Sequence, residues 1–213
     1  DGSIGLGGDA QGDSLSQVER IVGSAFDDRI TGSVGSDTLE GGQGNDVLQG
    51  GGGADALDGG AGIDIADYSL SNAAIVVGLD GRANTGGDAA GDSFANIEGI
   101  SGSAFADTLY GSAEDDILRG QGGNDRLTGF AGADTLEGGA GFDTADYSAS
   151  DAGVSVNLGT GNASGGHAAG DTLVSIEAVV GSSFDDTLIG GDNADSLSGG
   201  AGNDSLAGRA GAD

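Results

Sequence analysis

The residues of this chain most able to do chemistry are aspartates that recur every nine residues. Each one stands five places after a glycine and two places before an aliphatic residue or alanine. A period this strict presents the same carboxylate at the same point of a repeated backbone turn. These aspartates, at position six of the nine-residue unit, are Asp28, Asp37, Asp46, Asp55, Asp64, Asp107, Asp116, Asp125, Asp134, Asp143, Asp186, Asp195, Asp204 and Asp213. Stacked carboxylates repel one another unless a proton or a cation lies between them, so the pattern predicts cation binding.

Calcium is the cation that fits this set of donors best. It takes six to eight oxygens at about 2.3 to 2.6 Å in a flexible shell, whereas magnesium demands stricter octahedral geometry. Zinc prefers nitrogen or sulfur, and the chain has one histidine and no cysteine. The carboxylates and the main-chain carbonyls of glycine-rich turns would supply the oxygens. The glycines expected to contribute carbonyls are Gly41, Gly42, Gly44, Gly50, Gly53, Gly120, Gly123, Gly129, Gly132, Gly199, Gly200 and Gly202.

Each nine-residue unit divides into a turn of six residues and a strand of three. Glycines at positions one, two and four permit left-handed backbone angles, so the turn can curl around an ion. Two units, or 18 residues, would complete one coil of a flattened solenoid, with position eight facing its interior. The expected core residues are Ile30, Leu39, Leu48, Leu57, Leu109, Leu118, Leu127 and Leu136, with the smaller Ala66 and Ala145 ending the two full blocks.

The units form blocks separated by spacers of about 34 residues, and the whole cassette repeats every 79 residues. The spacers carry apolar stretches such as 75–77 and 154–158, and the second alternates with period two, so strands are expected there too. We therefore expect one continuous solenoid. Its segments are the end of a spacer (1–22), block one (23–67), a spacer (68–101), block two (102–146), a second spacer (147–180) and a truncated block three (181–213).

The unit resembles the RTX, or hemolysin-type, calcium-binding nonapeptide Gly-Gly-x-Gly-x-Asp-x-U-x. The best-formed examples are residues 41–49 and 199–207. The resemblance implies an all-β fold, a right-handed parallel β-roll or β-solenoid with calcium ions between stacked Gly-Asp turns. It also implies disorder without calcium, export by the type I secretion machinery, and folding outside a bacterial cell, either secreted or at the cell surface.

Composition argues against several other classes. A net charge of −29, from 35 acidic residues against 6 arginines, argues against nucleic acid as a partner, because binding phosphates needs clustered positive charge. No apolar run approaches the length of a membrane span. Aromatic residues make up 4% of the chain, so the core must be thin, and calcium would have to contribute the missing folding free energy. Both ends cut through the nine-residue pattern, which suggests a slice of a longer protein.

Some units depart from the pattern. Phenylalanine replaces the position-four glycine in the first unit of every block, as Phe26, Phe105 and Phe184, so these turns are not expected to bind calcium in the usual way. Glu114 and Asn193 replace the same glycine in second units. Asparagine at position five is expected to stabilise the turn, with direct ligation as an alternative, and occurs as Asn45, Asn124 and Asn203.

If each ion needs aspartates from units n and n+2, each full block holds three complete sites and the third block holds two, which makes eight. Spacer acids could complete further sites, and the candidates are Asp67, Asp92, Asp146 and Asp171. Glu19, Glu98 and Glu177 also recur in the spacers, where turn stabilisation or an end-of-block calcium site is favoured over catalysis. His167 aligns with acidic residues of the other cassettes and is expected in a surface loop.

The sequence holds no catalytic constellation, so the segment is not expected to be an enzyme. The favoured function is a calcium-binding structural segment of a secreted RTX protein, acting as a stalk, spacer, surface or filament element, because tandem copies lengthen a rod without adding a new site. The alternative is the C-terminal accessory and secretion module of a secreted protease, lipase or alginate epimerase. Ice or sugar binding would need a regular outward row of threonine or asparagine, which position seven lacks. Self-association, surface attachment and a merely solvated or disordered acidic tract stay open.

Overall fold

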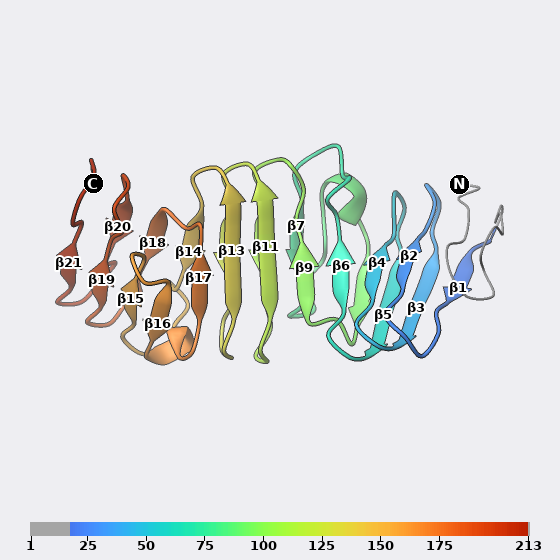
Figure 1. Cartoon of the computed structure of the whole chain (residues 1–213), viewed down its shortest axis with the longest axis horizontal. Helices are drawn as coiled ribbons and strands as arrows, with labels where there is room; N and C mark the ends of the chain where they lie inside the picture. Colours follow the sequence, from blue (N-terminus) through green and yellow to red (C-terminus); the bar gives the residue numbers. More distant parts are fainter. Residues whose placement is uncertain (1–17, 213) are drawn as a thin grey trace.

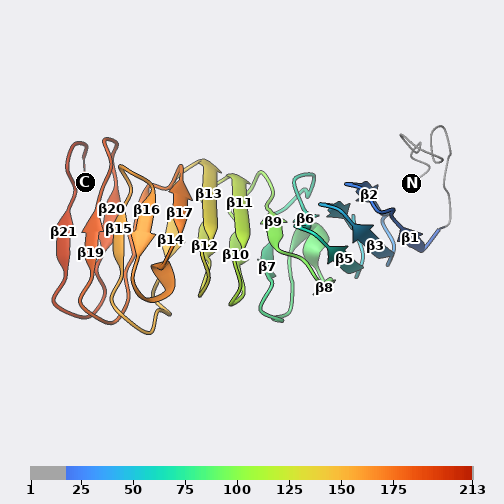
Figure 2. The same ribbon diagram turned by 60° about the horizontal axis from the view of Figure 1, so that its bottom comes forward.

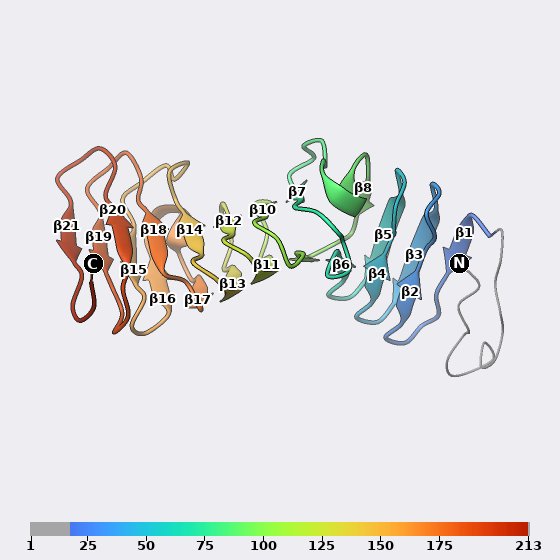
Figure 3. The same cartoon turned by 90° about the horizontal axis from the view of Figure 1, so that it is seen from above.

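The computed structural model describes residues 18–212 and shows an all-β chain, with 39% of residues in strands and 3% in helices. Short strands stack side by side along the long axis, with β1 near one end and β21 at the other (Figure 1). Seen from above, the chain winds between two layers of strands as a series of flattened coils (Figure 3). This is the parallel β-roll predicted from the sequence. The described residues contain no helix that is long and apolar enough to cross a membrane.

One layer is an 11-stranded sheet that runs the length of the described chain. In spatial order it consists of β2 (Arg29–Thr31), β4 (Val47–Gln49), β6 (Ile65–Asp67), β9 (Gly99–Ser101), β11 (Ile117–Gly122), β13 (Thr135–Ala140), β17 (Thr172–Val174), β16 (Asn162–Ser164), β15 (Ser155–Asn157), β19 (Thr187–Ile189) and β21 (Ser205–Ala207). Only the pairs that involve β16 are antiparallel.

The opposite layer is divided into two sheets. The first holds β1 (Arg20–Val22), β3 (Thr38–Gln43), β5 (Ala56–Ala61) and β8 (Ser93–Ala95). The second holds β20 (Ser196–Ser198), β18 (Ala178–Val180), β14 (Thr144–Asp146), β12 (Arg126–Thr128), β10 (Thr108–Tyr110) and β7 (Val76–Gly78). The division falls in the first spacer, where the 3₁₀ helix η2 (Gly87–Ala89) lies between β7 and β8 in the sequence (Figure 2).

The strand register confirms that two nine-residue units make one coil. Strands of adjacent coils pair in parallel with partners 18 residues apart, such as Ile30 with Leu48 and Leu109 with Leu127. The position-eight side chains predicted to form the core are all buried, and Ala66 and Ala145 are fully buried with them. The repeat therefore supplies one buried aliphatic side chain per unit, which makes a narrow core between the two layers.

The two spacers add different elements to the roll. The first adds β7, η2 and β8, and the second adds β15, β16, the 3₁₀ helix η3 (Gly166–Ala168) and β17. His167 lies in η3, half-buried, with its ring edge toward Phe130 at a centroid distance of 6.4 Å. The strands expected at 75–77 and 154–158 form as β7 and β15, each shifted or shortened by a residue or two.

The left-handed backbone angles fall at positions two and four of the turns, and this corrects the expectation for position one. Gly42 and Gly44 have φ of 113° and 110°, whereas Gly41 has no positive φ. A Cβ on Gly41 would instead approach closer than 3.0 Å to the carboxylate of Asp46. Position one is glycine because of close approach, not because of its φ angle. Three position-two residues other than glycine also adopt positive φ, namely Gln121, Phe130 and Arg209.

Replacing a left-handed glycine tests this account of the turns. Gly44→Ala would place a Cβ within 3.0 Å of the backbone of Phe26 and Asp27 and force alanine into φ of 110°. We expect it to lower the free energy of unfolding in calcium by about 2 kcal/mol or more, measured by urea denaturation.

Gly35→Ala is the matched control for Gly44→Ala. Gly35 occupies the same position four, but its φ is not left-handed, and a Cβ there would come no closer than 3.8 Å to Ser33 Oγ. It should be neutral or slightly stabilising. Equal losses in both variants would contradict the account.

Candidate metal centres

The position-six aspartates form two columns, one beside each layer of strands. The first column, ahead of strands in the 11-stranded sheet, contains Asp28, Asp46, Asp64, Asp116, Asp134, Asp186 and Asp204. The second column, ahead of strands in the opposite layer, contains Asp37, Asp55, Asp107, Asp125, Asp143 and Asp195. All of them except Asp28 and Asp204 are buried, although each carries an ionisable group. Asp213, the last predicted ligand, lies outside the described residues.

Main-chain hydrogen bonds hold each column in register. The N–H of Asp46 donates to Oδ1 of Asp64 at 2.7 Å, one coil further along. The N–H of Asp125 donates in the same way to Oδ1 of Asp143 at 2.8 Å. One oxygen of each such carboxylate is therefore occupied by the neighbouring coil, and the second oxygen decides what else the carboxylate can bind.

A second ladder runs in the opposite direction at position five. The N–H of Asn45 donates to Oδ1 of Asp27, and the N–H of Ile63 donates to Oδ1 of Asn45. Asn124 Oδ1 likewise accepts from the N–H of Phe142 at 3.0 Å. Asn45 and Asn124 thus stabilise turns by joining successive coils, as one of the two interpretations of the sequence predicted.

The second carboxylate oxygens divide the units into two groups. In the third, fourth and fifth units of both full blocks, Oδ2 is buried and has no hydrogen-bond partner. These six aspartates are Asp46, Asp55, Asp64, Asp125, Asp134 and Asp143. A buried carboxylate oxygen without a partner is costly, so each of these atoms indicates a missing cation or proton.

In the first and second units of each block, the turn itself binds the second oxygen. Asp28 Oδ2 accepts the N–H of Ser24 at 2.6 Å, and Asp107 Oδ2 accepts the N–H of Ser103 at 2.5 Å. In most of these turns the position-two serine Oγ also accepts a main-chain N–H, such as that of Phe105 from Ser103. The position-two residues of this group have no positive φ, so these turns close without the glycine curl.

The unpartnered oxygens face main-chain carbonyls of the next coil. A Cβ placed on Gly41 would meet both Asp46 Oδ2 and the carbonyl oxygen of Gly59. Because both oxygens lie beside the same Cα, they converge on one small region. A Cβ on Gly120 would likewise meet Asp125 Oδ2 and the carbonyl oxygen of Gly138. The region beside each position-one glycine therefore gathers oxygen donors of both kinds.

The predicted glycine ligands take two roles around these oxygens. The position-one glycines border the aspartate Oδ2 of their own turn, and they are Gly41, Gly50, Gly120, Gly129 and Gly199. The glycines at positions two and four adopt left-handed φ and shape the turn, and they are Gly42, Gly44, Gly53, Gly123, Gly132, Gly200 and Gly202.

Within residues 18–212, no three acidic, histidine or cysteine side chains come together as a metal-binding group. The donors available at each position are carboxylates from adjacent coils and main-chain carbonyls, all of them oxygen. Calcium accepts such a set, because it needs many oxygens in a flexible shell and few charges. The residues present therefore fit calcium.

A parallel β-roll with stacked aspartate turns defines a class of calcium-binding repeat protein. A family model described as "RTX calcium-binding nonapeptide repeat (4 copies)" matches residues 16–48, 31–66, 100–127, 110–145 and 180–213. The matches cover more than half of the chain, which therefore belongs to the RTX calcium-binding nonapeptide repeat family. This family is a structural calcium-binding repeat and not a catalytic one. No curated protein matches the chain significantly.

Burial raises the pKa of several of these carboxyls. Desolvation is the main cause for Asp125 and Asp134, whose pKa rises from 3.8 to about 7, with further contributions from neighbouring aspartates. Desolvation and the Asp92 carboxylate raise the pKa of Asp55 to about 6. The arginines do not relieve this repulsion, because their ion pairs join Glu40, Asp67, Asp80, Glu137 and Asp146.

These pKa shifts predict opposite effects of acid with and without calcium. A carboxyl whose pKa is raised by folding favours the folded state when protonated. That contribution is fully present below about pH 4 and is lost as the pH rises through about 6 to 7, the pKa values of Asp55, Asp125 and Asp134. In chelator, circular dichroism should show more β structure at pH 5 than at pH 8. Calcium affinity should fall over the same interval, because protons compete with the ion. More β structure at pH 8 in chelator would contradict this.

The spacers end one column in a way the nine-residue pattern did not reveal. Asp92 Oδ1 accepts the N–H of Asp55 at 2.8 Å, and its Oδ2 accepts the hydroxyl of the buried Tyr68 at 2.7 Å. Asp171 and Tyr147 repeat this arrangement in the next cassette. The tyrosine hydroxyl thus binds the oxygen that would otherwise face the next coil.

Two other spacer acids, Asp67 and Asp146, do not extend the columns, and this corrects the prediction that they complete end sites. Asp67 pairs with Arg29 at 2.6 Å, and Asp146 pairs with Arg126 at 2.5 Å. Hydrogen bonds from Ser69 and Arg29 outweigh burial and hold the pKa of Asp67 below its usual value. Both acids are therefore neutralised by arginine, so they do not need an ion.

Proposed function

We propose that the position-six aspartates and the turn carbonyls bind calcium at specific places, and that the bound ions fold this segment. The observation that carries the proposal is the set of six buried Oδ2 atoms without a partner, aligned in two columns beside converging main-chain carbonyls. A cation there would satisfy the oxygen and remove the repulsion between successive carboxylates.

The proposed setting is outside a bacterial cell. The net charge of −29 opposes compaction of the chain until cations neutralise part of it. Extracellular calcium modules bind at roughly 10⁻⁴ to 10⁻³ M, which is too weak to fill in the cytoplasm. The segment would then stay unfolded inside the cell, in the state that type I secretion requires, and fold after export. Proteins with RTX repeats are typically secreted by bacteria, which supports this setting.

The proposed role of the folded segment is a stalk or spacer, which self-association or surface attachment of the full protein could extend. The 11-stranded sheet runs through all the blocks and both spacers, so further cassettes can extend the same rod. The experiment is small-angle X-ray scattering of chains with one, two and three of the 79-residue cassettes. In calcium, the longest dimension should grow by an equal increment with each cassette. A compact particle whose length does not grow would contradict the stalk role.

A further inference from the structure

The first column does not stop at Asp64, the last aspartate of the first block. The N–H of Asp64 donates to Oε2 of Glu98 at 2.9 Å, although Glu98 lies 34 residues away in the spacer. The N–H of Asp143 donates to Oε2 of Glu177 at 2.9 Å across the same sequence separation. Within a block, the carboxylate of the next position-six aspartate makes this contact. Each glutamate therefore occupies the place of the next aspartate in its column.

The backbone before each glutamate also copies a repeat turn. A Cβ on Gly59 would meet the carbonyl oxygen of Asn96, just as a Cβ on Gly41 would meet that of Gly59. A Cβ on Gly138 would meet the carbonyl oxygen of Ser175. Asn96 and Ser175 both have left-handed φ, 50° and 51°, a conformation that is uncommon for residues other than glycine. The spacer thus brings a carbonyl and a carboxylate to the same places as the missing unit would.

The aspartates that face these spacer turns have an unpartnered oxygen. Asp64 Oδ2 and Asp143 Oδ2 are buried without a hydrogen bond, and both residues have 0% exposure. We propose that Glu98 and Glu177 each complete a calcium site, with Asp64 and Asp143 respectively, at the junction between a block and its following spacer. This inference rests on the proposed function, because it adds sites of the same chemistry.

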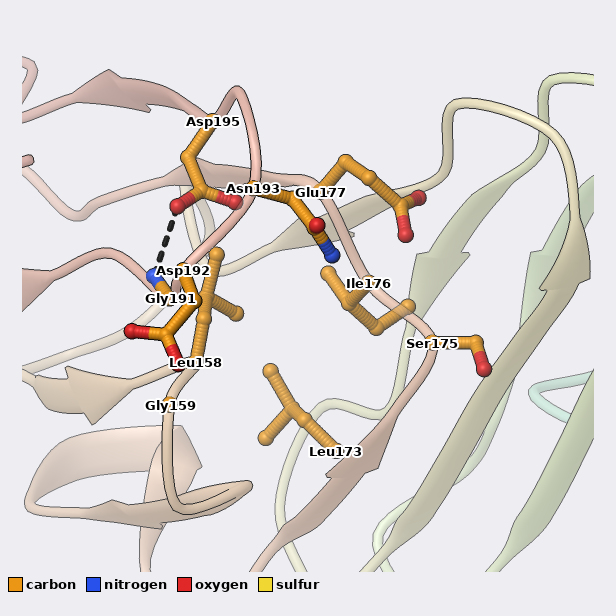
Figure 4. Close-up of a pocket in the computed structure, with 10 residues that line it drawn as sticks. All are labelled: Leu158, Gly159, Leu173, Ser175, Ile176, Glu177, Gly191, Asp192, Asn193 and Asp195. Atoms are coloured by element: carbon orange, nitrogen blue, oxygen red, sulfur yellow. Dashed lines mark hydrogen bonds between the residues drawn. The ribbon is translucent and has the colours of Figure 1, made fainter. Parts of the chain in front are cut away.

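These two sites would join consecutive blocks. Glu98 O accepts the N–H of Ile117 in the second block, and Glu177 O accepts the N–H of Ser196 in the third. In Figure 4 the carboxylate of Glu177 points away from Asp192 and Asp195 of the third block. Each glutamate thus serves the preceding block through its side chain and the following block through its main chain. The ion would lie where folding of one block is passed to the next.

The test counts calcium ions on the described chain and on the double variant Glu98→Gln with Glu177→Gln. Glutamine keeps an oxygen that can accept the N–H of Asp64 or Asp143, while it removes the charge that an ion needs. Glu114→Gln is the matched control, because Glu114 is exposed and lies outside both columns. Ions are counted by equilibrium dialysis with atomic absorption, and folding at saturating calcium is checked by circular dichroism.

We expect the double variant to bind two fewer ions than the wild type and the control to bind the same number. A double variant with the wild-type number would overturn the inference and leave the proposed function intact. A wild type that binds no calcium would overturn both. If the double variant does not fold in saturating calcium, the single variants are counted instead, and the wild-type number in either would overturn the inference.

Discussion

Removal of calcium by a chelator at pH 7.5 is expected to abolish most of the β-sheet signal of this chain. The core consists of one aliphatic side chain per unit, and aromatic residues make up 4% of the sequence, so burial contributes little per residue ordered. The aspartate columns then oppose folding, because buried carboxylates without partners stack along both layers. Calcium reverses the sign of that contribution, and by linkage its binding free energy becomes folding free energy.

Far-ultraviolet circular dichroism in calcium and in excess chelator, at equal ionic strength, measures this effect. Adding calcium back should restore the signal, whereas the same concentration of magnesium should restore less, because magnesium demands stricter geometry and holds its water. An equally formed β structure in chelator would contradict calcium-dependent folding.

Asp125→Asn is expected to have opposite effects with and without calcium. In calcium it should raise the ion concentration at the folding midpoint at least about tenfold, equivalent to about 1.4 kcal/mol, because one charged ligand is lost. In chelator at pH 8 it should instead favour the folded state, because it removes a buried carboxylate whose pKa is raised to about 7. Asparagine keeps an acceptor for the N–H of Asp107, so the ladder itself is preserved.

Two further variants control for the Asp125→Asn result. Asp107→Asn removes a carboxylate of the same column whose Oδ2 already accepts the N–H of Ser103, so the shift in midpoint should be smaller. Asp151→Asn removes an equal charge from an exposed site and should leave the midpoint nearly unchanged. Equal shifts in all three variants would show that net charge, and not specific ligation, determines the calcium dependence.

The blocks of this roll were predictable because their contacts follow from a fixed spacing. Position eight is aliphatic at Leu39 and Leu57, 18 residues apart, and those residues pair across β3 and β5 as the two-unit coil requires. The doubt about Phe26 and the other position-four replacements also had a physical basis, because their turns satisfy the aspartate through a serine N–H. The sequence signal for that difference was serine at position two, as in Ser24 and Ser103, which had gone unused.

The contacts made by the spacers were not predictable from the repeat. Glu98 and Asp92 stand 34 and 37 residues from the aspartates they serve, and only the path of β7, η2 and β8 brings them into the columns. Asp67 offered the same chemistry in the sequence, yet it lies beside Arg29. The side-chain type was therefore a sound guide to possible ligands, whereas the coil in which each spacer residue lies depends on its loops.

The central claim is that the six unpartnered Oδ2 atoms mark bound calcium, and a crystal structure of the chain grown in calcium tests it most directly. Anomalous scattering distinguishes calcium from water and magnesium. The account predicts an anomalous peak within coordination distance, about 2.3 to 2.6 Å, of Oδ2 of Asp46, Asp55, Asp64, Asp125, Asp134 and Asp143. Carboxylates at these positions that bind only water or share protons, with calcium absent or confined to the surface, would contradict it.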